Sequence, residues 1–264
     1  MLDKLKISFN LNNSILQNTK MRLSCVGCGP GDPELLTIKA VDVIKNAEVV
    51  FAPTAKKDRP SIALSVVKKY LSKSAKIVSL MFPMLKDKEA LKGYWKENAE
   101  QIAAAVRSGK KVVYLTVGDP SIYSTWIYIH RELTKNHRYI EIDIVPGIAS
   151  MFAFAAEAKI SLAEGEETLA IVPACYDMDR VRRTSNVCDT VVFLKDGRYF
   201  DNVIETLYDA GFAEDSMIAI AQDVAVQGEI MKMSTLANLQ GVKGPTEKYF
   251  SIMVAKKKKR SDRK

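Results

Sequence analysis

The amino-acid sequence predicts an α/β protein of two domains, with a parallel sheet in the N-terminal domain and an α+β arrangement in the C-terminal domain. Its 264 residues are enough for two small domains that each bury a hydrophobic core. Short apolar runs alternate with stretches of helical periodicity from residue 21 to about residue 160. This alternation is typical of a mostly parallel sheet covered on both faces. Strand patterns dominate after a polar link at 164–167, so we expect an interdomain cleft.

The N-terminal α/β domain, residues 21–160, is predicted to contain five pairs of a strand followed by a helix. Each strand is a short run of apolar residues, and each helix shows apolar residues that recur every three or four positions. In chain order, the pairs are 23–26 with 35–44, 49–52 with 62–71, 77–81 with 89–106, 112–117 with 122–133, and 140–145 with 149–158.

The C-terminal α+β domain is predicted to cover residues 161–255. Its strand signals lie at 169–172, 190–194, 217–221, 224–231 and 249–254. Helical patterns occur near 202–210 and 234–239 only. Residues 1–20 form a predicted N-terminal extension, and residues 256–264 form a basic tail that we expect to be solvated.

The positive net charge of +8 belongs to the two ends of the chain. The tail accounts for +6 and residues 1–20 for +2, which leaves residues 21–255 neutral. A neutral body argues against a nucleic-acid partner, although a module that uses the tail on RNA remains an alternative. The longest stretches without charge have 13 residues, against about 20 needed to cross a bilayer, so no membrane partner is expected.

The four cysteines favour a reducing, cytoplasmic location over an oxidised framework. Cys25 and Cys28 have the spacing of a zinc or redox pair, but no second pair follows, and the chain has two histidines. No metal site is therefore expected.

Three loops carry the chemistry of the predicted first domain, because each stops a buried strand at a glycine before a helix begins. They are residues 27–32, 118–121 and 146–150. Loops of this kind meet at the carboxyl edge of a parallel sheet, where ligands bind backbone N–H groups. The first loop has Asp32 where a dinucleotide fingerprint has its third glycine. It also lacks the Lys-Ser/Thr pair of a phosphate loop. Its Asp32 and the Asp119 of the second loop suit a ligand with positive charge.

The three loops resemble the signatures of the tetrapyrrole methylases, class III S-adenosylmethionine-dependent methyltransferases, in the same order. The matching segments are GCGPGDPELLT at 27–37, GDP at 118–120 and VPGI at 145–148. Two further segments, DPSIYST at 119–125 and ISLAEGEE at 160–167, are similar to the subgroup that methylates C20 of precorrin-2 or of its cobalt form in cobalamin biosynthesis. The family's other members, which methylate other positions of corrin-pathway or sirohaem tetrapyrroles or a protein histidine, remain alternatives.

The resemblance implies that the methyl donor, S-adenosyl-L-methionine, lies in the cleft. It places donor contacts at Pro30, Gly118, Asp119, Ile122, Ala149 and Ser150, and, where the alignment is weaker, at Leu194 and Asp223. For Asp119, a helix N-cap ahead of residue 122 is the alternative.

The remaining expectations concern the tetrapyrrole acceptor and the assembly. Tyr123 is the side chain that we expect to point at the reacting centre. A polycarboxylate acceptor calls for cationic side chains at the rim, and we expect it to be bound by Lys56, Lys57 and Arg59, with Lys86, Lys88 and Lys92 as the next candidates. The resemblance also implies a homodimer.

Overall fold

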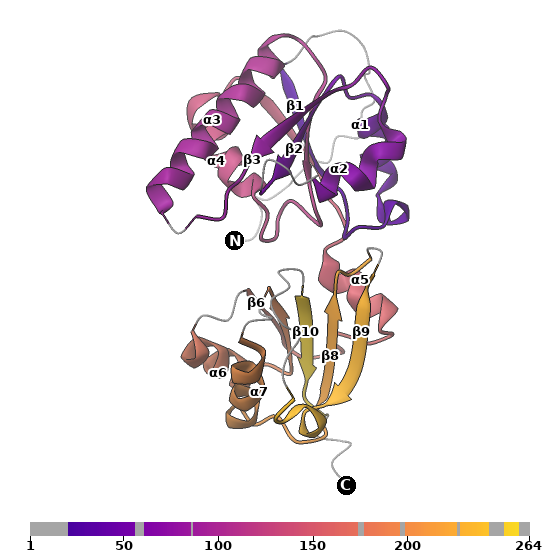
Figure 1. Ribbon diagram of the computed structural model, residues 1–264, viewed down its shortest axis with the longest axis vertical. Helices are drawn as coiled ribbons and strands as arrows, with labels where there is room; N and C mark the ends of the chain where they lie inside the picture. Colours follow the sequence, from indigo (N-terminus) through magenta and orange to yellow (C-terminus); the bar gives the residue numbers. More distant parts are fainter. Residues whose placement is uncertain are drawn as a thin grey trace, which may run out of the picture.

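The computed structural model describes residues 21–55, 61–85, 87–173, 177–195, 199–225, 228–242 and 251–258. Figure 1 shows two lobes, each built on a five-stranded sheet, with the indigo to magenta part of the chain in one and the orange to yellow part in the other. The two-domain α/β prediction is confirmed. The expected extension at 1–20 lies outside the described residues.

The first sheet is parallel throughout, as the alternation of strands and helices predicted. Its strand order is β3-β2-β4-β1-β5. The strands are β1 (Arg22–Gly27), β2 (Val49–Thr54), β3 (Lys76–Met81), β4 (Val112–Thr116) and β5 (Glu141–Val145).

Helices cover both faces of this sheet (Figure 1). On one face, α1 (Ile38–Lys45) and α2 (Ile62–Val67) pack on the strands, and the short 3₁₀ helices η1 (Pro33–Leu35) and η2 (Lys68–Tyr70) flank them. On the other face lie α3 (Lys88–Arg107) and α4 (Trp126–Asn136). The inner strands β2 and β4 are therefore buried almost throughout, whereas the edge strands β3 and β5 keep exposed residues.

Capping side chains fix where several helices begin. The Thr37 hydroxyl accepts a hydrogen bond from the Ala40 N–H at the start of α1, and the Ser61 hydroxyl accepts one from the Leu64 N–H at the start of α2. The helix predicted from residue 122 begins only at Trp126, because residues 118–125 continue as a loop. That loop borders the cavity described below.

The second sheet is mixed, with strand order β6-β7-β10-β8-β9. Its β6–β7 pair is parallel and its other pairs are antiparallel. The strands are β6 (Leu169–Pro173), β7 (Thr190–Leu194), β8 (Met217–Gln222), β9 (Ile230–Thr235) and β10 (Ser251–Lys256).

The two faces of the second sheet have different covers. One face packs against α6 (Met178–Val187), α7 (Phe200–Asp209) and the 3₁₀ helix η4 (Ala237–Leu239). The other face packs against α5 (Ser150–Glu157), whose Met151 and Phe154 contact it. The packing of α5 therefore places it with the second sheet, although the sequence predicted residues 149–158 as part of the N-terminal domain. Figure 1 shows it at the junction of the lobes.

Three local expectations in the second lobe were wrong. Helix α6 was not predicted, because only Val181 and Ser185 in it are buried and no apolar stripe marks it. The strand expected at 224–231 begins at Ile230, since Asp223, Ala225 and Gly228 take positive φ angles in a turn. The helix expected at 234–239 is the end of β9 followed by η4.

The start of the basic tail is anchored, in contrast to the expected solvated run. Lys256 lies in β10, and its ammonium contacts the Glu167 carboxylate at 2.8 Å with both side chains 13–14% exposed. The Lys257 ammonium donates to the Asn186 carbonyl, and the Lys258 ammonium pairs with Asp215. The rest of the tail lies outside the described residues.

In the part of the chain that the structure describes, no helix has the length and apolar character needed to cross a membrane. No group of three or more His, Cys, Asp or Glu residues in that part is placed to hold a metal ion.

Candidate functional site

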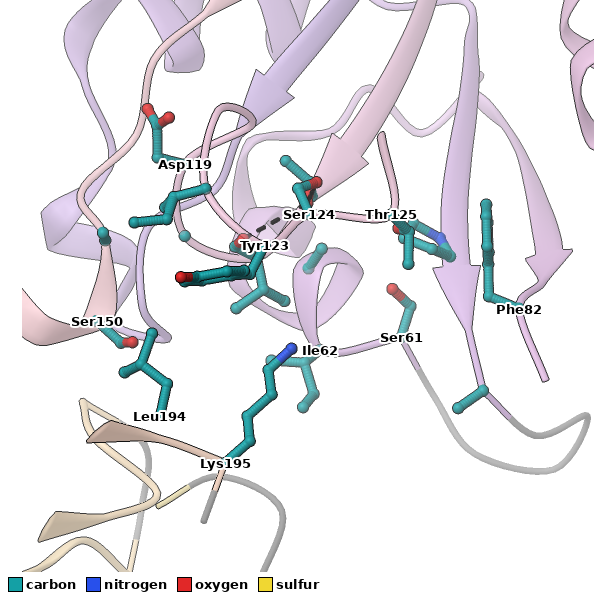
Figure 2. Close-up of a pocket in the computed structure, with 18 of the residues that line it drawn as sticks. Ser61, Ile62, Phe82, Asp119, Tyr123, Ser124, Thr125, Ser150, Leu194 and Lys195 are labelled. Carbon is teal, nitrogen blue, oxygen red and sulfur yellow. Dashed lines mark hydrogen bonds between the residues drawn. The ribbon is translucent and has the colours of Figure 1, made fainter. Parts of the chain in front are cut away.

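A cavity of about 890 Å³ lies between the two lobes, within the range of about 300–1,000 Å³ typical of small-molecule sites. The loops at the carboxyl edge of the first sheet line one side of it. The ends of β7 and β8 and the start of β10 line another, through Leu194, Asp223 and Ile252. Figure 2 shows this site with both lobes contributing side chains.

The first two glycine loops join through their backbones. Gly29 N–H donates to the Gly118 carbonyl at 3.2 Å, and Gly118 N–H donates back to the Gly29 carbonyl at 2.7 Å. Both residues have φ = +69°, a conformation that residues with a Cβ rarely adopt. Glycine therefore lets the two loops pair and brings their main chain to the cavity wall.

The third loop approaches as closely. A Cβ atom on Gly147 would lie 2.3 Å from the Gly118 carbonyl oxygen and 2.8 Å from the Gly27 carbonyl carbon. A Cβ on Gly27 would lie 2.6 Å from the Gly147 nitrogen. Because these neighbours are backbone atoms, a side chain at either position would force the loops apart. The convergence of the three loops at one sheet edge, expected from the sequence, is therefore present.

Asp119 braces two of these loops. Its carboxylate accepts hydrogen bonds from the Gly147 N–H at 2.9 Å, from the Ser121 N–H at 2.8 Å and from the Ser121 hydroxyl. Partial burial opposes ionisation, but these hydrogen bonds outweigh it and hold the pKa of Asp119 below its usual range. The N-cap alternative is wrong, since Thr125 occupies the cap position of α4. Asp119 is therefore ionised at neutral pH and places a negative charge beside the cavity.

Tyr123 spans the gap between the lobes. Its backbone has φ = +48°, and its side chain is 43% exposed. The hydroxyl donates a hydrogen bond to the Ile171 carbonyl in β6 at 3.3 Å. Partial burial raises its pKa, although the positive charge of Arg180 works in the opposite direction. Near neutral pH the hydroxyl is a proton donor rather than a base.

An aromatic wall forms the side of the cavity away from the glycine loops. Trp95 of α3 and Tyr128 of α4 stack with ring centroids 4.1 Å apart and an interplanar angle of 4°, and Phe82 lies after β3. Pro83, Met84 and Leu85 continue this apolar surface. No local motif marks these residues, because they come from separate elements, and the sequence did not predict them.

The candidate residues fall into two groups. The six expected donor contacts of the first lobe all line the cavity, as do Tyr123 and the two second-lobe candidates: Pro30, Gly118, Asp119, Ile122, Ala149, Ser150, Leu194 and Asp223. Their contact with a donor stays a prediction.

The basic candidates fare differently. Lys56, Lys57 and Arg59 lie outside the described residues, and so does Lys86. Lys88 and Lys92 belong to α3 and are not among the residues that line the cavity, and the Lys92 ammonium pairs with Glu89 at 2.7 Å. Lys195, which directly follows β7 and lines the cavity, was not among the residues that the sequence predicted for the site.

Comparisons with known proteins agree with this architecture. The family model of the tetrapyrrole (corrin/porphyrin) methylases matches residues 22–240. A probable cobalt-precorrin-2 C(20)-methyltransferase of Methanocaldococcus jannaschii is 34% identical over 89% of this chain and 96% of its own length. The cobalt-precorrin-2 C(20)-methyltransferase of Salmonella typhimurium is 30% identical over 75% of this chain and 82% of its own.

A solved structure extends the comparison to the fold. The uroporphyrin-III C-methyltransferase of Thermus thermophilus, complexed with S-adenosylhomocysteine, has a TM-score of 0.64 and 20% identity. The match covers 89% of this chain and 97% of that one.

Proposed function

Since this chain belongs to the tetrapyrrole methylase family, we propose that it transfers a methyl group from S-adenosylmethionine to C20 of precorrin-2 or of its cobalt form, in cobalamin biosynthesis. The observation that carries the proposal is the cavity between the lobes, which has glycine loops on one side and an aromatic wall on the other. Two ligands of different chemistry, a donor and a flat acceptor, suit these two sides.

The glycine-loop side fits the methyl donor. Pro30, Gly118 and Ala149 line this side with small side chains or none, so a ligand can approach the backbone closely. Asp119 on this side and Asp223 on the second-lobe side give the cavity negative character, which matches the cationic sulfonium. S-adenosylmethionine supplies a methyl group activated by its cationic sulfonium, and the transfer releases neutral S-adenosylhomocysteine and the proton that C20 carried.

The chain's own residues therefore have little acid catalysis to perform. Their main task is to hold the acceptor carbon in line with the methyl group, a proximity effect that can reach about 7–11 kcal/mol. The stacked rings of Trp95 and Tyr128 offer an apolar aromatic surface for a macrocycle. We assign Tyr123 to the reacting centre, where its protonated hydroxyl can exchange its hydrogen bond to the Ile171 carbonyl for one to the acceptor.

The function can be tested with both acceptor forms. Purified protein is incubated with S-adenosylmethionine and either precorrin-2 or its cobalt form, and the product is examined by mass spectrometry and NMR. We expect the mass gain of one methyl transfer, located at C20. A methyl group at another carbon would support the other family activities instead, and no transfer to either acceptor would contradict the proposal.

We further propose that Lys56, Lys57 and Arg59 bind acceptor carboxylates at the rim. Each exposed pair contributes at most about 1 kcal/mol, so single changes are nearly silent. Changing all three to alanine should raise the KM for the tetrapyrrole several-fold at low salt and less at high salt, with donor affinity unchanged. An unchanged KM at low salt would move this role elsewhere.

The assembly and location form a separate proposal. We propose a cytoplasmic homodimer, since the family resemblance supports the dimer and the four cysteines favour a reducing location. Light scattering should give twice the 29.4 kDa chain mass across working concentrations, and a monomer mass throughout would contradict the dimer.

A further inference from the structure

Lys195 is the one cationic side chain among the described residues that line the cavity. It directly follows β7, next to Leu194, and is partly buried. The charged lining residues described alongside it are Asp119 and Asp223. A cation in this position adds to a site whose other charges are negative.

The backbone at Lys195 is unusual. Its φ angle is +63°, in the left-handed region that glycine adopts freely and residues with a Cβ disfavour. Such conformations cluster at ligand sites. Figure 2 shows the result of this turn, since the Lys195 side chain extends from the end of β7 into the cavity toward Ile62.

The position of Lys195 lies between the two sides of the cavity. In Figure 2, Asp119, Ser150 and Leu194 lie to one side, and Ser61, Thr125 and Phe82 lie to the other. The ammonium of Lys195 and the ring of Tyr123 lie between them in this view. Lys195 is therefore in reach of a ligand that occupies the aromatic side and extends toward the donor.

An ammonium group beside the aromatic side would affect how an acidic ligand binds there. An acidic ligand that packs on this mostly apolar wall loses water from its carboxylates, which is unfavourable unless a charged partner replaces that water. A lysine ammonium is a compact point charge with three donors, and it forms short, charge-assisted hydrogen bonds to a carboxylate.

We propose that Lys195 is a specificity-determining residue that binds a carboxylate side arm of the tetrapyrrole acceptor. This inference rests on the proposed function, because it assumes an acidic macrocycle on the aromatic side. The contact contributes to the affinity for the acceptor. It also distinguishes acidic tetrapyrroles from esterified or neutral ones.

The test is steady-state kinetics of four variants of the full chain. Lys195→Met removes the charge and keeps the length, Lys195→Gly removes the side chain and relaxes the backbone, and Lys195→Arg keeps the charge. Lys135→Met, at an exposed position of α4, is the matched control. Initial rates are measured against acceptor and donor separately, at low and high salt, after circular dichroism has confirmed folding.

We expect Lys195→Met and Lys195→Gly to raise the acceptor KM by about fivefold to tenfold, with donor KM and kcat little changed. Lys195→Arg and Lys135→Met should stay within about twofold of wild type, and the effect should shrink at high salt. The glycine variant keeps the test valid if the methionine variant folds poorly.

Two results would overturn the inference while the proposed function stands. An unchanged acceptor KM would show that Lys195 binds no acceptor carboxylate, and a rise in donor KM alone would assign it to the carboxylate of the donor. If the wild-type protein methylates a tetrapyrrole at another carbon, the proposed position fails and the Lys195 variants are tested with that acceptor. If it methylates no tetrapyrrole, both proposals fail.

Discussion

The first sheet contributes to the site three loops that follow neighbouring strands, whereas the second sheet contributes single residues from separate strands. All strand pairs of the first sheet are parallel, so the loops after β1, β4 and β5 meet and contact one another through Gly27, Gly118 and Gly147. In the second sheet β10 runs antiparallel to β7 and β8, so Leu194, Asp223 and Ile252 reach the cavity from strand ends and a strand start.

This difference shows why the two sides of the site tolerate change differently. In the first lobe, tightly packed backbone builds the site, and a Cβ atom added at Gly27 or Gly147 would push neighbouring loops apart. In the second lobe, the site consists of side chains on which the fold of the lobe does not depend. Substitutions should therefore have large, shared effects in the first lobe and small, separable effects in the second.

The largest expected effect is that of Gly147→Ala. Its Cβ would lie 2.3 Å from the Gly118 carbonyl oxygen, so the loops must separate. We expect a loss of about 3 kcal/mol in the free energy of unfolding and the loss of donor binding. Urea unfolding and calorimetric titration with S-adenosylhomocysteine measure the two quantities.

Two other glycines provide the comparison for Gly147. Gly211→Ala in the second lobe meets nothing within 4 Å but has φ = +76°, so it should cost only about 1–2 kcal/mol and spare binding. Gly93→Ala in α3 has open space and should stabilise by up to about 1 kcal/mol. Equal losses for Gly147→Ala and Gly211→Ala would remove the contrast between the lobes.

Asp119→Ala should have an intermediate effect. The loss of hydrogen bonds to a charged acceptor lowers the free energy of unfolding by about 1–3 kcal/mol at neutral pH and weakens donor binding. Because the folded-state pKa of Asp119 is lowered, its contribution is present above the unfolded value of about 3.9 and is lost as pH falls through the folded value. Wild type and variant should therefore converge in stability in strongly acidic urea melts.

Asp189 in the second lobe is the matched control. Hydrogen bonds from the Thr168 N–H and hydroxyl lower its pKa in the same way. Asp189→Ala should lower stability over the same pH range but leave donor affinity unchanged. If both variants bind the donor as wild type does, Asp119 serves only to join the loops.

The smallest expected effect concerns the basic tail. The Lys256–Glu167 pair is only 13–14% exposed, so Lys256→Met should cost about 1–2 kcal/mol, between the values for surface and buried pairs. A chain that ends after Lys258 should unfold at the wild-type temperature, whereas one that ends after Ala255 should unfold earlier. Equal melting temperatures for the two truncations would mean that the pair contributes nothing.

The sequence predicted the first lobe more accurately than the second, for a physical reason. Strands buried on both faces are uninterrupted apolar runs, and glycines at their ends mark loops that a parallel sheet must bring together. Helix α6 buries only Val181 and Ser185, and the turn before β9 uses Asp223 and Ala225 at positive φ, so neither leaves a local pattern.

The same reasoning divides the site. The glycine-loop side is local in sequence, and its residues were foreseen. The aromatic wall arises only when α3 and α4 lie side by side and stack Trp95 on Tyr128. The orientation of Lys195 depends on its positive φ angle, which no residue type in the segment predicts. Contacts between distant elements, rather than motifs, shape the aromatic side of the cavity.

The buried thiol in the first glycine loop has a chemical consequence. A thiolate near an activated methyl group would be a competing nucleophile, and the protein would slowly alkylate itself. Cys28 is fully buried, with its sulfur 3.6 Å from the Val26 carbonyl oxygen, and burial raises its pKa to about 12. At physiological pH only a minute fraction of Cys28 is ionised, so the loop can hold a sulfur atom and remain inert through many turnovers.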